Sequence, residues 1–245
     1  MNWHDTHALV TGGTRGIGLQ LVKQLLDKGA KVTATGTTET ALSKVRLQYP
    51  QVNWLTLNQA DPASRQTLVD SFREQGVQLV IHNAGIQQMR DWTLPNAPVT
   101  YDTAQEMAVN FVGPVELTRL LLPLLAQESR AQIVFVTSGL ALAPKSSSPV
   151  YCASKAALRS FAKSLRAQIQ QAGWNIQIQE ALPPLVDTDM TRGRGKGKIS
   201  ATAAASQILK GIAKGQAEID VGATALLRLI LRLSPALGER IMIGR

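Results

Sequence analysis

The stretch Thr11-Gly12-Gly13-Thr14-Arg15-Gly16-Ile17-Gly18 lies where an apolar run, residues 8–11, gives way to apolar residues spaced three and four apart. Glycines at such a turn permit a tight bend, close approach of the backbone to a pyrophosphate, and close packing of helix on strand. The amino end of the following helix presents free N–H groups to an anion. The stretch therefore predicts a strand, a phosphate-binding turn and a helix, although glycine-rich turns also occur without a ligand.

Further apolar runs alternate with helical patterns along most of the chain. Gly29 and Gly173 mark the ends of two of the intervening helices. The remaining runs cover residues 31–35, 53–57, 78–82, 132–137 and 175–179. This alternation predicts an α/β fold with a mostly parallel sheet and helices on both faces. No repeat or linker interrupts it, so we expect residues 1–245 to form a single domain.

Composition argues against several classes of protein. Of the 245 residues, 44% are hydrophobic and 18% charged, which is enough apolar material for a full core. The net charge of +9 suits an anionic partner such as a cofactor phosphate, but no nucleic-acid-binding motif accompanies it, so no nucleic acid is expected. Cys152 is the only cysteine, and His4, His7 and His82 lack ligand spacing with it, so no disulfide or metal site is expected. No signal peptide is identified, and a cytoplasmic location is expected.

Tyr151 and Lys155 lie four residues apart on a predicted helix, so their side chains share one face. A phenol is a poor acid or base at neutral pH, but a neighbouring ammonium and a cationic nicotinamide are expected to favour the phenolate and to lower the pKa of Tyr151. Such pairs also arise by chance on helices. Their interpretation depends on other motifs in the chain, which are Asn83-Ala84-Gly85, Asn110 and Ser138.

These motifs, together with Gly12, Gly16 and Gly18 spaced by three residues and then by one, resemble the classical short-chain dehydrogenase/reductase family over about residues 7–190. The resemblance implies a Rossmann-type, doubly wound, mostly parallel sheet of seven strands. It also implies an oxidoreductase that transfers a hydride between a nicotinamide and a small carbonyl or alcohol substrate. A homo-oligomer, either a dimer or a tetramer, is expected on the same ground.

The resemblance assigns catalytic roles to four residues. Tyr151 is expected to act as general acid or base, and Ser138 to donate to the substrate oxygen. Lys155 is expected to promote the phenolate and to bind the nicotinamide ribose. Asn110 is expected to hold a water molecule that extends the proton path to solvent.

The cofactor follows from the end of the second strand, Thr35-Gly36-Thr37-Thr38, which lacks the acidic residue that NAD-specific members place there. Arg15 can offer a guanidinium fork to a 2′-phosphate, and Thr37 and Thr38 can add hydroxyl donors. NADP(H) is therefore expected in preference to NAD(H), which stays an alternative. The expected cofactor-binding residues are Gly12, Thr14, Arg15, Gly16, Ile17, Gly18, Thr37, Asn58, Asn83, Ala84, Gly85, Tyr151, Lys155, Val186 and Thr188.

Three positions carry further expectations. Pro183-Pro184 stands where the family usually has Pro-Gly, which predicts a stiffer nicotinamide loop. His82 is expected to be a packed residue at a strand end rather than a base, because Tyr151 fills that role. Asp61, followed by proline, is expected to cap a helix rather than to bind the cofactor.

Residues 191–245 depart most from the family pattern. Residues 191–198 are basic and glycine-rich where the family places a substrate lid, and they either attract an anionic substrate or form a solvated loop. Residues 222–233 predict a very apolar helix that is too short to span a bilayer. Packing or a subunit contact is favoured for this helix, ahead of peripheral membrane contact through residues 222–245.

The leading hypothesis is an NADP(H)-dependent carbonyl reductase or alcohol dehydrogenase, with 3-oxoacyl carrier-protein reduction as its nearest specific form. The alternative is a catalytically silent NADP(H)-binding regulator or a membrane-associated adaptor. The expected catalytic residues favour the enzyme, whereas the C-terminal apolar helix favours the adaptor. The motifs leave open the physiological substrate and the reaction direction.

Overall fold

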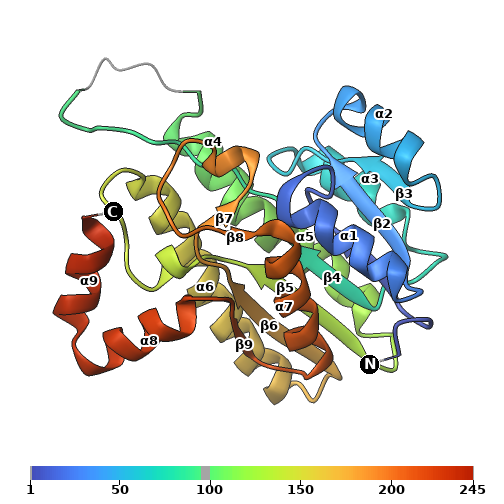
Figure 1. Ribbon diagram of the computed structural model, residues 1–245. Coiled ribbons are helices and arrows are strands. Elements are labelled where there is room, and N and C mark those ends of the chain that lie inside the picture. The colour runs from blue at the N-terminus through green and yellow to red at the C-terminus, as the bar shows by residue number, and fades with distance from the viewer. Residues whose placement is uncertain (1, 95–99, 245) are drawn as a thin grey trace.

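Seven parallel strands form the centre of the molecule. The computed structural model describes residues 2–94 and 100–244. Its main sheet has the strand order β3-β2-β1-β4-β5-β6-β9 (Figure 1), which confirms the predicted doubly wound, seven-stranded sheet. The strands are β1 (His7–Val10), β2 (Lys31–Gly36), β3 (Asn53–Thr56), β4 (Leu79–His82), β5 (Ala131–Val136), β6 (Ile176–Leu182) and β9 (Glu218–Asp220).

Apolar cores lie on both faces of this sheet because side chains alternate along buried parallel strands. On β1, Ala8 and Val10 enter one core and Leu9 enters the other. The first core is covered by α1 (Gly16–Asp27), α2 (Glu39–Gln48) and α7 (Ala201–Ala213). The second is covered by α3 (Pro62–Asp70), α5 (Gly113–Leu125) and α6 (Pro149–Gln171).

The predicted helix boundaries are confirmed where local chemistry sets them. Gly29 and Gly173 follow α1 and α6 with φ of +82° and +69°, a left-handed conformation that favours glycine. Asp61 caps α3, since its carboxylate accepts hydrogen bonds from the backbone N–H groups of Ala63 and Ser64 at 3.1 and 3.2 Å.

Helices α4 (Thr103–Met107) and α5 are joined by a π-helical turn, η1 (Ala108–Val112), into one continuous helix. By length and composition alone, residues 103–125 could span a membrane. One side of this helix, with Leu117, Leu121 and Leu125, is fully buried in the second core.

The chain after β6 forms the small elements near the cleft and the C-terminal helices. Strands β7 (Val186–Asp187) and β8 (Ile199–Ser200) pair with each other, with short 3-10 turns at η2 (Gly139–Ala141) and η3 (Asp189–Thr191). Helix α8 (Thr224–Leu233) lies within the predicted apolar helix, and α9 (Pro235–Ile243) follows it after a sharp turn at Ser234 (Figure 1). The pair extends away from the sheet (Figure 1).

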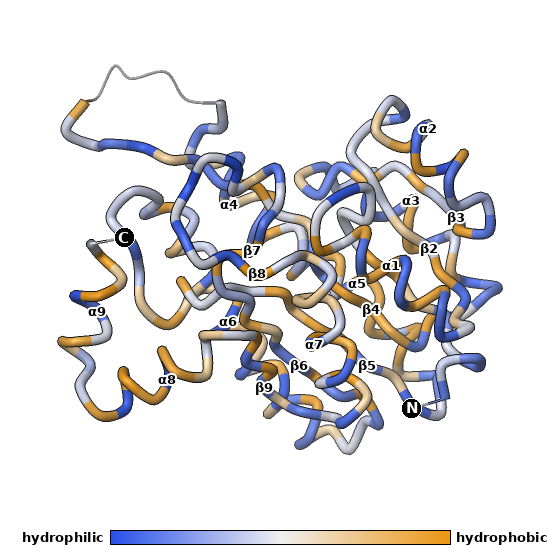
Figure 2. The backbone as a smooth tube through the Cα atoms, in the orientation of Figure 1, coloured by the Kyte–Doolittle hydropathy of each residue, from blue (hydrophilic) through white to orange (hydrophobic). Residues whose placement is uncertain are grey.

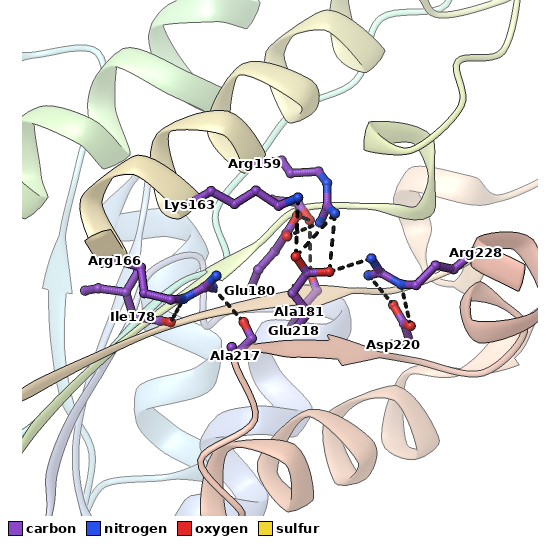
Figure 3. Close-up of polar contacts among 11 residues, drawn as sticks. Arg159, Lys163, Arg166, Ile178, Glu180, Ala181, Ala217, Glu218, Asp220 and Arg228 are labelled. Atoms are coloured by element: carbon purple, nitrogen blue, oxygen red, sulfur yellow. Dashed lines mark hydrogen bonds and ion pairs between the residues drawn. The ribbon is translucent and has the colours of Figure 1, made fainter. Parts of the chain in front are cut away.

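A charged network joins β9 to its neighbours (Figure 3). Arg159 on α6 pairs with Glu180 and, at 3.3 Å, with Glu218. Arg228 on α8 forms two hydrogen bonds of 2.7 Å with the carboxylate of Asp220. Glu180 has no exposed side-chain surface, and its burial raises the pKa of its carboxyl group. The network fixes the start of α8 to the edge strand of the sheet.

Candidate active site

The glycine turn approaches the end of β4 so closely that side chains are excluded. Gly12 has a φ of +68°, and a Cβ there would lie 2.9 Å from Ala84 Cα. A Cβ at Gly18 would lie 2.1 Å from the carbonyl oxygen of Gly12. Thr11 Oγ1 accepts hydrogen bonds from the N–H groups of Asn83 and Ala84, at 3.0 and 3.1 Å. Asn83 Nδ2 donates in return to the carbonyl oxygens of Thr11 and Gly12, at 3.0 and 3.1 Å.

A cleft of about 620 Å³ opens beyond the carboxyl ends of β1, β2, β4 and β5. In a doubly wound sheet this edge is the usual place for a ligand, at the point where the strand order reverses. The structure brings most of the expected cofactor-binding residues to this cleft. They are Gly12, Thr14, Arg15, Gly16, Ile17, Gly18, Thr37, Asn58, Asn83, Ala84, Gly85, Tyr151, Lys155 and Thr188.

Val186 is the member of that set that the structure does not bring to the cleft. It is buried in β7, and its carbonyl oxygen accepts a hydrogen bond of 2.5 Å from Thr191 Oγ1. Thr188 does line the cleft, and its backbone N–H donates to the same Thr191 hydroxyl at 3.2 Å. Thr191 therefore holds the loop after Pro183-Pro184 in place.

The end of the cleft beside the glycine turn favours an anionic ligand. The first turn of α1 has N–H groups without helical partners, and the exposed residue Arg15 precedes it. Thr37 lines the cleft, whereas the hydroxyl of Thr38 caps α2 by accepting from Ala41 N–H at 3.1 Å. Among the described residues that line the cleft, Asp189 alone carries a carboxylate, and it is paired with Arg192.

Helix α6 places Tyr151 and Lys155 at the other end of the cleft. Lys155 Nζ donates to the carbonyl oxygen of Val136 at 2.9 Å and lies 5.8 Å from the centroid of the Tyr151 ring. Lys155 is only 3% exposed, and this burial lowers its pKa from 10.5 to about 8. The ammonium form therefore still predominates at neutral pH.

Tyr151 corrects one sequence-based expectation. In the protein alone, burial raises the pKa of the phenol, Cys152 adds to the rise, and a hydrogen bond with Ser138 opposes it. The expected lowering is therefore wrong for this state, because desolvation outweighs the Ser138 hydrogen bond and the Lys155 amine is directed at Val136. The phenol is protonated at neutral pH, which is the form that can donate a proton.

Ser138 and Asn110 adjoin the cleft without lining it. Ser138 follows β5, is 8% exposed, and its Oγ accepts from Leu140 N–H at 3.1 Å. Asn110 is fully buried in η1, where Nδ2 donates to Ile86 O at 2.8 Å and to Ser154 Oγ at 3.1 Å. Its Oδ1 accepts from Ile86 N–H at 2.9 Å. The Asn110 side chain thus ties the loop after β4 to α6, and both of its amide hydrogens are already engaged.

A buried acid near this site was missing from the sequence-based set. Glu106 lies four residues before Asn110 and is 2% exposed, and its Oε1 accepts from Gln88 N–H at 3.0 Å. Burial raises the pKa of Glu106, and its charge acts on Tyr151. Glu106 and Asn110 therefore share a helix face that holds residues 86–88. That spacing was the available signal, but a glutamate on a helix is ordinarily solvated.

His82 packs as expected at the end of β4. Its Nε2 lies 2.9 Å from Thr118 Oγ1, and its ring stacks on Phe135 with centroids 5.0 Å apart. Burial lowers the pKa of His82 to about 3, so the imidazole is neutral. Within residues 2–94 and 100–244, no group of three His, Cys, Asp or Glu side chains is placed to hold a metal ion.

The doubly wound sheet, the glycine turn and the Tyr–Lys pair beside one cleft define a dinucleotide-dependent oxidoreductase. A family model described as short chain dehydrogenase matches residues 6–199. The chain belongs to the short chain dehydrogenase family, which confirms the predicted family and the prediction of an oxidoreductase.

Individual relatives agree with this membership. The uncharacterized oxidoreductase DltE of Bacillus subtilis (strain 168) is 35% identical over 227 residues, which cover 89% of each chain. The 3-oxoacyl-acyl-carrier-protein reductase FabG of Escherichia coli (strain K12) is 30% identical over 196 residues, or 78% of each chain. A short chain dehydrogenase from Burkholderia cenocepacia J2315, solved in complex with NADP, is 28% identical with a TM-score of 0.87 over 99% of both chains.

Proposed function

We propose that the protein is an NADP(H)-dependent oxidoreductase that interconverts a carbonyl and an alcohol, with Tyr151 as general acid and base. One observation carries this proposal. Tyr151 and Lys155 line the same cleft as the glycine turn, and Ser138 lies close enough to the Tyr151 phenol to influence its pKa. A protein that only binds a dinucleotide has no need of this arrangement.

The residues of the cleft fit a dinucleotide. The turn leaves no room for a Cβ at Gly12 or Gly18, and the N–H groups of the first turn of α1 are free to bind a phosphate. Arg15 and Thr37 would hold the 2′-phosphate of NADP(H), and the scarcity of carboxylates around the cleft disfavours the ribose contact typical of NAD enzymes. Lys155 and Thr188 would hold the nicotinamide half. The relative solved with NADP supports the same preference.

A bound nicotinamide supplies or accepts the hydride. In the reductive direction, Ser138 Oγ donates a hydrogen bond to the carbonyl oxygen, and Tyr151 gives its phenolic proton to that oxygen as negative charge develops there. The Lys155 ammonium then stabilises the phenolate that remains. Asn110 acts on this site through the loop that contains Ile86. Its side chain accepts a hydrogen bond from the backbone N–H of Ile86 and donates one to the carbonyl oxygen of the same residue.

The same proposal includes the arrangement of the chain. Residues 1–245 act as a single domain in which residues 191–245 supply the substrate lid and the C-terminal helices. The pairing of β7 with β8 and the hydrogen bond of 2.8 Å from Arg194 to Gln87 Oε1 support this arrangement. We also propose assembly as a dimer or tetramer and a cytoplasmic location, because both are usual in the family.

The test is NADPH oxidation measured over a panel of ketones, aldehydes, quinones and 3-oxoacyl thioesters, with NADH run in parallel. We expect turnover of at least one class of carbonyl, with a higher kcat/KM for NADPH. Tight NADPH binding without turnover of any compound would contradict the proposed enzyme activity and would support the alternative function, a catalytically silent regulator.

A further inference from the structure

Exposed apolar side chains concentrate at the C-terminal end of the molecule. Twelve large apolar side chains are exposed among the described residues, and six of them belong to α8 and α9. Figure 2 shows these two helices as predominantly hydrophobic and extending from the rest of the molecule. The six are Leu226, Leu229, Leu233, Leu237, Ile241 and Ile243.

The three exposed leucines of α8 lie away from the side of the helix that packs on the rest of the molecule. Thr224 is buried on the inner side of α8, and a Cβ at Gly238 of α9 would lie 2.4 Å from Leu231 Cδ2. Leu226, Leu229 and Leu233 follow helical spacing along the opposite, outer side of α8. The exposed fraction of Leu233 reaches 78%. The outer side is therefore apolar without any packing partner within the described chain.

A second exposed apolar segment lies beside the end of α9. Met89, Trp92 and Leu94, in the loop after β4, are also exposed. Arg90 N–H of that loop donates to Ser147 O at 3.1 Å, and Ser146 Oγ donates to Ile243 O at 3.0 Å. The loop after β4 and the end of α9 therefore contact two consecutive residues, Ser147 and Ser146 respectively, and both lie on the same side of the molecule in Figure 1. We call these nine exposed residues the apolar face.

The charges that border the apolar face are three arginines, Arg90, Arg232 and Arg240, and two exposed acids, Asp91 and Glu239, which leaves a net positive border. Arg232 and Arg240 are exposed on α8 and α9, and Arg90 stacks over Trp92 with its guanidinium carbon 4.3 Å from the ring centroid. Arg228 is different, because Asp220 and Glu218 neutralise it and bind it to β9 (Figure 3). Arginine and tryptophan beside exposed leucines are the composition of a helix that lies in a membrane interface.

We infer that the apolar face docks the protein on an anionic lipid surface. The leucines of α8 enter the headgroup boundary, and Arg232 and Arg240 lie at the lipid phosphates. A contact with a second copy of the chain is the competing occupant of this face, and the experiment below distinguishes the two. Ile243 also lines an apolar groove that contains Cys152, the neighbour of Tyr151, so docking brings the lipid surface close to the active-site helix.

The test is flotation of the full-length protein with vesicles of phosphatidylcholine alone or with 30% phosphatidylglycerol, at low and high salt. We expect strong flotation only with the anionic vesicles, reduced by salt. Leu229→Glu together with Leu233→Glu should weaken this binding at least tenfold. Arg232→Glu should weaken it at least fivefold, since each basic residue near an anionic surface contributes about that factor.

The matched control is Leu47→Glu on α2, where the leucine is 86% exposed and lies outside the apolar face. Far-UV circular dichroism and NADPH binding check that each variant folds. Absence of flotation with anionic vesicles would overturn the inference, as would equal flotation of the Leu47 and Leu229/Leu233 variants. Light scattering identifies the competing occupant: a smaller oligomer in the Leu229/Leu233 variant, without vesicle binding of the wild type, would make this face a subunit contact.

Discussion

Replacing Lys155 with methionine should make the cofactor-free protein more stable while abolishing turnover. The Lys155 amine is buried, with the carbonyl oxygen of Val136 as its hydrogen-bond acceptor at 2.9 Å, and its pKa falls from 10.5 to about 8. One pKa unit corresponds to about 1.4 kcal/mol, so burying the charged amine costs the fold at most about 3.5 kcal/mol at pH 7. Losing the hydrogen bond to Val136 offsets about 1 kcal/mol of the gain.

The expected net stabilisation of Lys155→Met is therefore at most about 2.5 kcal/mol, or about 5–10 °C in Tm for a chain of this length. Its pH dependence has a defined sign. Burial lowers the pKa of Lys155 in the folded protein to about 8. Below pH 8 the amine is charged in both the folded and the unfolded state, so the cost of burying the ammonium is fully present. It is lost as the pH rises toward 10.5, the pKa of the unfolded chain, because only the unfolded state keeps the proton in that window.

The assay is thermal unfolding of the wild type and Lys155→Met without cofactor at pH 7 and pH 10, with NADPH oxidation measured in parallel. Lys210→Met is the control, because Lys210 is exposed on α7. A Lys155→Met protein less stable than the wild type at pH 7, or a Tm difference that is the same at both pH values, would refute the reasoning. Either result would mean that burial of the charged Lys155 amine does not destabilise the folded protein.

Two further substitutions test other parts of the account. Arg15→Ala should raise the KM for NADPH about ten- to a hundredfold and leave the KM for NADH within about twofold, because it removes a charge-assisted hydrogen bond to the 2′-phosphate; equal losses in steady-state kinetics with both cofactors would contradict this. Arg159→Met should cost about 3–5 kcal/mol of unfolding free energy at pH 8, since it leaves the buried Glu180 carboxylate without its cation. The loss should shrink as the pH falls, because burial raises the pKa of Glu180 and the protonated carboxyl group no longer needs a cation, and a loss that urea unfolding shows to be independent of pH would contradict the reasoning.

The parts of the fold that could be predicted from the sequence are those with a strong local signal. Six strands of the main sheet follow runs of apolar residues, and the turn before α1 follows its glycines. Strand β9 escapes this reasoning because it has one apolar residue, Ile219, between two acids. Its place in the sheet depends on parallel pairing with β6 and on the ion pairs with Arg159 and Arg228.

The candidate site divides in the same way. Residue types and spacing were enough to locate the cleft, because Tyr151, Lys155 and the glycine turn lie close to it through the topology of the sheet. Electrostatics could not be predicted, since the raised pKa of Tyr151 depends on how much protein surrounds the phenol. The spacing of Glu106 four residues before Asn110 places it on the same helix face, but its burial and its contact with Gln88 are tertiary and could not be predicted from the sequence.

The most direct test of the central claim compares the wild type with Tyr151→Phe, using a carbonyl substrate identified in the panel. Tyr151→Phe removes the proton donor and keeps the ring. NADPH binding, followed by its fluorescence, should be nearly unchanged, while single-turnover NADPH oxidation should fall by at least two to four orders of magnitude. Turnover near the wild-type rate with intact binding would contradict the assignment of Tyr151 and, with it, the proposed mechanism.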